Sequence, residues 1–325
     1  MTGSPLVSIL MPCYNVGSFL ADCIDSLLKQ TYENLQIVMI DDGSSDNTWE
    51  LMRKLAARDS RIEIYTQENR GVAFTRNRLL DKVRGEYVLF IDSDDWVEPE
   101  MVEYLVRILR KENAEMATCG MVVNDSPVSS VYSYSVFSKN EILPVFLFHN
   151  EMKGSLCNKM FSVAIMQNVR FCDGISYGED ALFCWHLLLN LNRVVVSDRE
   201  LYHYRMNSES ISHQSFGSRK LSGHRAWRII NEDVDRICPQ FKDIARARWG
   251  LETLYLLRQA GQSNYEKDDN IRVLQKTLRR SISQMKRLNM VSGKELINAL
   301  IVSRCYSYCL IYNKLHKLKI AIAGK

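Results

Sequence analysis

The stretch Tyr87-Val88-Leu89-Phe90-Ile91-Asp92-Ser93-Asp94-Asp95 decides the fold of this sequence. Its apolar, β-branched and aromatic half is typical of a buried strand, and its acidic half ends that strand. Two carboxylates one residue apart at a strand end can hold a hard divalent cation, with phosphate oxygens and water as the remaining ligands. The same aspartates can also form a simple turn held by hydrogen bonds.

On both sides of this stretch, short apolar runs alternate with segments of helical period. The alternation predicts right-handed βαβ units and an α/β fold with a mostly parallel sheet. The other expected strands are Leu6–Tyr14, Leu35–Ile40, Ile62–Thr66 and Ala114–Val123. The expected helices are Val16–Lys29, a segment capped by Asp46, Val72–Val83 and Glu98–Glu112.

Polar side chains follow three of these strands at their carboxyl ends. They are Tyr14-Asn15, Asp41-Asp42 and Asp92-Ser93-Asp94. In parallel sheets ligands bind outside the carboxyl ends of the strands. We therefore expect these groups to converge on one ligand-binding edge.

The second half of the chain predicts a different organisation. We expect a loop or irregular β excursion at Asp125–Lys139, helices at Glu141–His149, Gly154–Ile165 and Glu179–Leu191, a strand at Arg193–Ser197 and a linker at Asn207–Gly223. The apolar pattern of Trp227–Leu318 predicts several amphipathic helices. The predicted domains are residues 1–215, with the α/β sheet, and residues 216–325, mainly helical.

The charge is unevenly divided between these two parts. Residues 1–215 carry 20 Lys and Arg against 29 Asp and Glu, whereas residues 216–325 carry 22 against 9, net charges of −9 and +13 in a chain of net charge +4. Basic residues among apolar ones, such as Arg304, Lys314, Lys317 and Lys319, predict contact with an anionic membrane surface. The alternative is a basic face that is solvated or contacts another subunit.

Composition excludes several classes of protein. With 325 residues, 46% hydrophobic and 25% charged, the chain is neither disordered nor fibrous. Its apolar runs are too short to span a bilayer, and Met1–Pro5 lacks the basic start of a secretory signal. Nine cysteines without a C-x-x-C pair fit reduced thiols, and we expect a cytoplasmic protein.

Motifs for other chemistries are missing. Ser292-Gly293-Lys294 lacks the upstream glycine of a P-loop, and no G-x-G-x-x-G sequence is present. Glu179-Asp180 opens a helix, where acids complement the helix dipole. One of these carboxylates can instead serve as a general base for an attacking hydroxyl.

Together the motifs resemble the family 2 inverting glycosyltransferases with the GT-A fold, of the bacterial capsule, O-antigen or exopolysaccharide type. The resemblance covers about residues 5–212. It is carried by Val7–Asn15, Asp41–Asp46, Asn69–Val72 with Arg76-Asn77, Gly85–Tyr87, Asp92–Asp95, Asn158–Phe161, Gly178–Asp180 and Tyr202–Arg205.

The resemblance implies a role for each site residue. Pro12, Tyr14 and Asn15 would border the nucleotide of a UDP-sugar, and Asp42, or Asp41, would bond the uracil. Arg76 would bind the base or the diphosphate, and Ser93 would contact the nucleotide sugar. Asp92 would contact the ribose or the metal, and Asp94 would coordinate Mn²⁺ or Mg²⁺ at the diphosphate.

For the acceptor side, the resemblance implies a base in Glu179-Asp180, with Asp180 favoured, and an acceptor site near Lys159 and His203. The sequence lacks the Q-x-x-R-W motif of processive synthases, which favours the addition of a single sugar to a glycan or lipid-linked acceptor. A homodimer is left open and no nucleic-acid partner is expected.

Two other functions compete with this one. A non-catalytic nucleotide-sugar-binding module would bind without turnover. A nucleotidyltransferase would carry a glycine-rich, arginine-containing loop after its first strand, where Cys13-Tyr14-Asn15-Val16-Gly17 stands here.

Overall fold

The computed structural model describes residues 3–124, 126–148, 152–206 and 216–310. The chain forms two compact units. The first contains Met1–Leu143, Glu151–Asp173 and Phe183–Ser208, and the second contains Pro144–Asn150, Gly174–Leu182 and Glu209–Lys325. The predicted division at residue 215 differs from this one, because Pro144–Asn150 and Gly174–Leu182 belong to the same unit as the C-terminal helices. Gly174–Leu182 carries Glu179 and Asp180.

A nine-stranded sheet forms the first unit, in the order β3-β2-β1-β4-β8-β6-β9-β5, with β7 paired to β9. Neighbours β3, β2, β1 and β4 are all parallel, as are β6 and β9, which confirms the mostly parallel α/β sheet. The strands are β1 (Val7–Cys13), β2 (Leu35–Asp41), β3 (Ile62–Thr66), β4 (Tyr87–Phe90), β5 (Trp96–Val97), β6 (Met116–Val123), β7 (Tyr134–Ser138), β8 (Lys159–Ser162) and β9 (Arg193–Tyr204).

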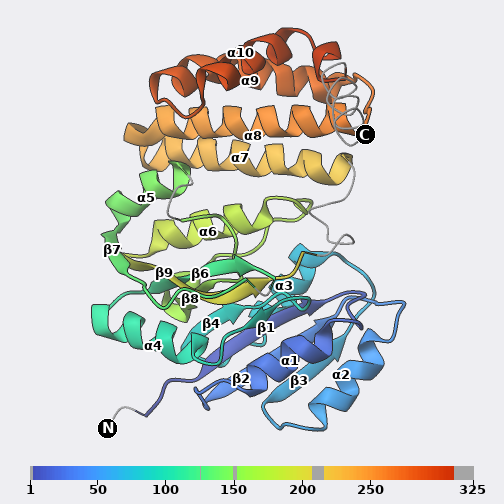
Figure 1. Cartoon of the computed structure of the whole chain (residues 1–325), viewed down its shortest axis with the longest axis vertical. Helices are drawn as coiled ribbons and strands as arrows, with labels where there is room; N and C mark the ends of the chain where they lie inside the picture. Colours follow the sequence, from blue (N-terminus) through green and yellow to red (C-terminus); the bar gives the residue numbers. More distant parts are fainter. Residues whose placement is uncertain (1–2, 125, 149–151, 207–215, 311–325) are drawn as a thin grey trace. The chain divides into compact units, whose positions relative to one another are not determined.

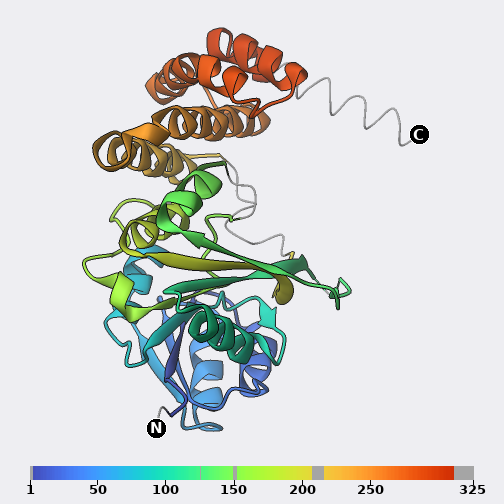
Figure 2. The same ribbon diagram turned by 90° about the vertical axis from the view of Figure 1, so that its left-hand side faces the viewer.

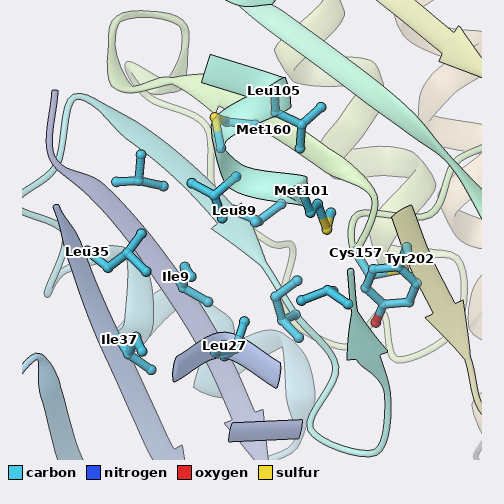
Figure 3. Packing of buried hydrophobic residues seen from close by; sticks show 14 of the residues in the cluster. Ile9, Leu27, Leu35, Ile37, Leu89, Met101, Leu105, Cys157, Met160 and Tyr202 are labelled. Atoms are coloured by element: carbon cyan, nitrogen blue, oxygen red, sulfur yellow. The ribbon is translucent and has the colours of Figure 1, made fainter. Parts of the chain in front are cut away.

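Helices cover both faces of this sheet because its central strands are apolar on both sides. Ile9 and Ile37 point into a cluster that includes Leu27 of α1 and Leu105 of α4 (Figure 3). Ser8, by contrast, is buried and hydrogen-bonds Gln36. The helices are α1 (Leu20–Leu28), α2 (Thr48–Ala56), α3 (Val72–Leu80) and α4 (Met101–Glu112). Two further helices, α5 (Lys139–Phe148) and α6 (Glu179–Asn190), run across the boundaries of the units.

Three expectations differ from the structure. The helix expected at Gly154–Ile165 is instead strand β8 followed by the short 3₁₀ helix η1 (Val163–Met166). The segment Asp125–Lys139 contains the regular strand β7, and the two-residue strand β5 was not expected. In each case the strand is fixed by pairing with distant segments, since β8 fits antiparallel between β4 and β6, and β7 and β5 pair with β9.

The second unit is built from long helices that lie side by side in Figure 1 and Figure 2. They are α7 (Ser218–Ile237), the 3₁₀ helix η3 (Pro239–Phe241), α8 (Lys242–Gln262), α9 (Asp269–Arg287) and α10 (Gly293–Arg304). Asp268 caps α9, and Ser292 with Glu295 forms a capping box on α10. The helices expected beyond Trp227 are thus present to residue 310. Residues 207–215 of the expected linker, and Lys314, Lys317 and Lys319, lie outside the described residues, whereas residues 218–223 are not a linker but begin α7.

Two general features bear on function. All nine cysteines lie in the described part of the chain, and none forms a disulfide. No helix among the described residues has the length and apolar character needed to cross a membrane.

Candidate functional site

Hydrogen bonds join the carboxyl ends of β1, β2 and β4 at one edge of the sheet. The Asp42 N–H donates to the Cys13 carbonyl at 2.8 Å, which fixes the end of β2 beside β1. The Ser93 hydroxyl donates to the Pro12 carbonyl at 2.9 Å, which ties the acidic turn after β4 to β1 from the other side. The polar groups expected at this edge are therefore neighbours.

The loop after β1 presents Tyr14 and Asn15. Tyr14 is half exposed, and Asn15 adopts a left-handed φ of 50°, which asparagine tolerates better than most residues. The Asn15 side-chain oxygen accepts from the Ser45 N–H at 2.9 Å, and the Asn15 N–H donates to the Ser44 hydroxyl at 2.9 Å. Asn15 thus holds the two loops together and leaves the Tyr14 ring open to a ligand.

Asp46 is not the N-cap of α2 as expected, because Asn47 holds that position and makes no side-chain capping hydrogen bond. The Asp46 carboxylate accepts from the Thr48 N–H and from the Gly17 N–H, each at 3.0 Å, so it ties α2 to the loop after β1. Desolvation raises the pKa of Asp46, but hydrogen bonds from Thr48 and Gly17 outweigh it and the pKa is lowered. Asp46 is therefore a charged, structural anchor of this edge.

Asp41 and Asp42 are both buried at the end of β2. Asp41 accepts from the Thr66 hydroxyl at 3.1 Å and from the Ser44 N–H at 3.2 Å. Asp42 accepts from the N–H groups of Arg70 and Gly71 at 2.9 and 2.8 Å, which shapes the turn before α3.

Behind Asp42 lies a polar network that the sequence did not indicate. Gln67 donates to Asp42 at 2.7 Å and to the Thr75 hydroxyl at 3.0 Å, and Arg78 donates to Gln67 at 2.6 Å. The network fixes the Asp42 carboxylate. No sequence signal marks Gln67 or Arg78, because their roles depend on contacts between separate elements.

Arg76 and Asp92 form an ion pair at the centre of the edge. Arg76 is 5% exposed, and its Nη2 lies 3.3 Å from Oδ1 of the partly exposed Asp92. The guanidinium lies over the rings of Phe171 and Phe90, at 5.5 and 6.0 Å from their centroids. The protein therefore holds a desolvated positive charge beside the acidic turn.

Asp95 is the buried anchor of that turn. Its carboxylate accepts from the Tyr202 hydroxyl at 2.5 Å and from the Arg205 N–H at 2.8 Å. Arg205 also donates from Nε to the Asp94 carbonyl at 2.8 Å. Burial, with the negative charges of Asp92 and Asp94, raises the pKa of Asp95 to about 8. Tyr202 and Arg205 lie over 100 residues downstream, so sequence reasoning did not assign them to the site.

Potential metal-ligand atoms gather at the same turn. Among the described residues, one oxygen each of Asp92 and Asp95 and the Cys157 sulfur lie within 4.8 Å of one another, whereas Asp94 is outside this group. The carboxylate oxygens suit Mg²⁺ or Mn²⁺, which take one or two carboxylates and fill their coordination with phosphate and water. A thiol is a soft ligand and does not suit either ion.

Lys159 and His203 are both buried within the first unit. The Lys159 ammonium donates to the Asn158 side chain at 2.8 Å. The His203 ring stacks on Trp96 at 5.0 Å, with Nε2 at 2.7 Å from Glu98 and Nδ1 at 2.9 Å from the Asn124 carbonyl. Both ring nitrogens of His203 are thus engaged within the fold.

Glu179 and Asp180 form the first turn of α6 and belong to the second unit. Gly178, directly before them, has a φ of +77°, which favours glycine. The segment that leads to them is held to α7, because the N–H groups of Ser176 and Tyr177 both donate to the Ser222 hydroxyl at 3.1 Å. Their role as a base remains a prediction.

The sequence matches the family model "Glycosyl transferase family 2" over residues 8–170. It is 31% identical over 219 residues to Glycosyltransferase GlyA of Streptococcus pneumoniae, a match that covers 63% of this chain and 31% of GlyA. The chain therefore spans about a third of that relative.

Solved structures share the fold. Staphylococcus aureus TarS 1–349 in complex with UDP-GlcNAc superposes with a TM-score of 0.69 over 95% of this chain and 88% of the TarS 1–349 chain, at 19% identity. The mannosyltransferase PcManGT from Pyrobaculum calidifontis, in complex with GDP-Man and Mn²⁺, gives a TM-score of 0.57 over 93% of this chain and 88% of its own, at 17% identity.

Proposed function

We propose, because this chain belongs to glycosyl transferase family 2, that it moves one sugar from a nucleotide-diphosphate sugar to a hydroxyl of a glycan or lipid-linked acceptor. The observation that carries the proposal is the sheet edge where the Arg76–Asp92 ion pair, the buried Asp42 carboxylate and the Asp92–Asp95 turn meet. A diphosphate needs positive charge beside it, and a nucleobase needs fixed hydrogen-bonding groups. This edge offers both.

The donor would lie along the ends of the strands. Tyr14 offers an exposed ring, and Pro12 and Asn15 shape the loop that carries it. Asp42, or Asp41, would accept from the base, since a fixed carboxylate accepts from an imide N–H. UDP is the nucleotide we expect. The UDP-GlcNAc complex of TarS supports a UDP-sugar, while the GDP-Man complex of PcManGT keeps other nucleotides open.

Arg76 and Ser93 would act at the diphosphate and the sugar. The Arg76 guanidinium is already desolvated and paired with Asp92, so it can face a phosphate without further loss of hydration. Ser93 holds the acidic turn against β1.

Asp94 and Asp92 would hold Mn²⁺ or Mg²⁺, with the diphosphate and water as further ligands. A bound cation would neutralise the negative charge that develops on the departing diphosphate. The Mn²⁺ in the PcManGT complex supports a divalent cation beside the nucleotide sugar in this fold. Asp95 would act through the other carboxylates, since its own oxygens are bonded to Tyr202 and Arg205.

In the transfer, the acceptor hydroxyl oxygen would attack the anomeric carbon from the face opposite the diphosphate. The new C–O bond forms as the bond to the phosphate oxygen breaks, and that oxygen keeps the electron pair. The hydroxyl proton passes to a carboxylate, for which we favour Asp180 over Glu179. The anomeric configuration is inverted.

The proposed setting is cell-surface polysaccharide synthesis of the capsule, O-antigen or exopolysaccharide type, on the cytoplasmic side of the membrane. Similarity to GlyA supports a glycosyltransferase role, and the basic charge of residues 216–325 supports contact with an anionic membrane. Lys159 and His203 are the residues proposed for the acceptor side, and both are buried and hydrogen-bonded within the first unit. A homodimer remains a prediction.

The function is tested by release of nucleoside diphosphate from a panel of nucleotide sugars, with a mixture of glycan acceptors and Mn²⁺. We expect release from one UDP-sugar, lost on addition of EDTA and in Asp94→Asn. Asp59→Asn is the matched control, because Asp59 pairs with Arg61 just before β3, at the opposite end of the strands. It should keep full activity.

The alternatives give different results. Binding of UDP without release of sugar under every condition would favour a non-catalytic nucleotide-sugar-binding module. Release of pyrophosphate from a nucleoside triphosphate and a sugar phosphate would favour a nucleotidyltransferase. Equal activity of Asp94→Asn and the native chain would contradict the role of the acidic turn.

A further inference from the structure

The second unit contains a pocket of about 360 Å³ on α8. One wall is Tyr177, in the segment before α6, and the other is the face of α8 that carries Arg248, Glu252, Tyr255 and Arg258. The volume lies within the range of small-molecule sites, which combine apolar walls with a few fixed polar groups. None of these residues has a role in the proposed donor site.

Two of the lining residues, Arg248 and Glu252, form a charged pair. Arg248 is 7% exposed, lies over the Trp227 ring at 5.2 Å and bonds Glu252 through Nη2. Its buried Nε meets no acceptor among the described residues. Burial lowers the pKa of Arg248 and raises that of Glu252. Charged groups that are partly shielded from water form strong hydrogen bonds with a polar ligand.

The walls are aromatic with polar edges. Tyr255 is 48% exposed, although it lines a pocket. Burial, and then the neighbouring Tyr255 and Glu252, raise the pKa of the Tyr177 hydroxyl, which therefore stays protonated and able to donate. Arg258 adds a cation at the rim, with Glu295 as a distant partner at 4.0 Å. Flat apolar rings beside convergent Arg and Glu groups match the two faces of a sugar ring, its C–H surface and its hydroxyl edge.

The pocket is coupled to the predicted base through a single short segment. Tyr177 stands two residues before Glu179 and three before Asp180. Ser222 accepts from the Ser176 and Tyr177 N–H groups, and a Cβ on Gly223 would lie only 2.7 Å from the Tyr177 ring. The wall of the pocket and the first turn of α6 are thus held on the same helix, within the same unit.

We propose that this pocket binds a sugar residue of the acceptor glycan, with the ring against Tyr255 and its hydroxyl groups toward Glu252 and Arg258. The inference rests on the proposed glycosyl transfer, because only a transferase has an acceptor. It assigns the helical unit the task of holding the acceptor chain near the segment that carries Glu179 and Asp180.

The test is saturation-transfer NMR on the full chain with a panel of methyl glycosides. The panel contains hexoses, 6-deoxyhexoses, N-acetylhexosamines and uronic acids. We expect saturation of at least one glycoside, and an affinity about tenfold weaker in Tyr255→Ala, the loss that follows when an aromatic contact is removed. Arg258→Gln should weaken binding less. The matched control is Ile297→Ala, which removes an exposed apolar side chain of α10 outside the pocket.

A glycoside that saturates is then assayed as acceptor with the donor found by the release assay. We expect Tyr255→Ala to raise its KM about tenfold and to leave the donor KM unchanged. Saturation that is equal in Tyr255→Ala and the native chain, or absent for the whole panel, would overturn the proposal. Displacement of the glycoside by millimolar inorganic phosphate alone would mark an anion site and would also overturn it.

The same samples separate this inference from the proposed function. UDP binding with Mn²⁺ reports on the first unit alone. If UDP binds and a donor is turned over while no glycoside depends on Tyr255, the pocket assignment fails and the function stands. If glycosides depend on Tyr255 but no nucleotide sugar binds, the transferase function fails, and with it the assignment of the ligand as an acceptor.

Discussion

Tyr202 supplies the hydroxyl that holds the buried carboxylate of Asp95. Tyr202→Phe should lower the free energy of unfolding by about 1–3 kcal/mol, because it leaves a buried acceptor without its donor. It should also weaken nucleotide-sugar binding about tenfold, equivalent to ~1.4 kcal/mol, by loosening the Asp92–Asp95 turn. Urea unfolding and calorimetric titration measure the two effects.

Tyr104→Phe is the matched control for this change. Tyr104 is also buried, and its hydroxyl shares a 2.7 Å hydrogen bond with Ser197, outside the acidic turn. We expect a similar loss of stability and unchanged nucleotide binding. Equal binding defects in both variants would mean that Tyr202 affects binding only through general stability.

The lowered pKa of His224 should make the stability of the second unit depend on pH. Burial, and then the nearby Arg228, lower its pKa from 6.5 to about 4. Between pH 6.5 and pH 4 the folded state therefore binds fewer protons at His224 than the unfolded state does. The stabilisation from the neutral imidazole is complete above pH 6.5 and is lost as the pH falls toward 4. The contribution is about 3 kcal/mol.

His224→Gln should flatten this dependence, because the amide does not titrate and can still bond the Thr277 hydroxyl, as the imidazole does. Urea unfolding at pH 7.5 and pH 4.5 measures the difference. The same acid-induced loss in the variant and the native chain would show that another group is responsible.

Some residues of the site could be predicted from the sequence and others could not. The acidic turn was found because strand ends in a parallel sheet share one edge, which follows from order along the chain. Arg205 was noted only as part of the Tyr202–Arg205 motif, without a role at the acidic turn, and Gln67 was not found, since it acts on a residue of another element and belongs to no local pattern. The same holds for the pocket around Arg248, whose walls come from segments about 70 residues apart.

At the scale of elements, the position of the segment before α6 depends on its close contact with α7. Gly223 lies inside α7, where alanine would ordinarily stabilise a helix by about 1 kcal/mol. Its Cβ would lie 2.7 Å from Cδ1 of Tyr177. We expect Gly223→Ala to displace this segment and lower kcat about tenfold, with no gain in stability. Steady-state kinetics and thermal unfolding measure both.

Gly293→Ala serves as the control, because a Cβ there meets nothing within 4 Å. It should leave kcat unchanged. If Gly223→Ala stabilises the protein and keeps kcat, the position of the segment before α6 does not matter for turnover.

Elements were predicted well where local pattern and tertiary pairing agree. β1, β2 and β3 alternate with helices, and the sequence predicts both that they exist and how they follow one another along the chain. β8 contradicts its local pattern, because the apolar residues around Lys159–Ser162 also fit a helix, and only insertion between β4 and β6 makes them a strand.

At the scale of the whole molecule, the basic charge of the second unit predicts contact with anionic lipid. Lys276, Arg279 and Arg280 are exposed on α9, at helical spacings of three and four. Replacing all three with Gln should weaken binding to phosphatidylserine vesicles about 100-fold, at ~1 kcal/mol per charge. Vesicle flotation measures the change, and high salt should reproduce it.

The control removes the same charge from the first unit, as Lys29→Gln, Arg53→Gln and Lys54→Gln, whose side chains are also exposed. It should bind vesicles like the native chain. Equal binding by both triple variants would support the alternative, a merely solvated basic face. Point substitutions are preferable to deletion of residues 216–325, since the second unit also contains Pro144–Asn150 and Gly174–Leu182.

The central claim is that the sheet edge binds a nucleotide sugar through a cation held by the acidic turn. Calorimetric titration of UDP tests it most directly, with Mn²⁺ and with EDTA, for the native chain, Asp94→Asn and Asp59→Asn. We expect tight binding with Mn²⁺ in the native chain and Asp59→Asn, and at least tenfold weaker binding in EDTA and in Asp94→Asn. Binding that is the same in all four cases would contradict the claim.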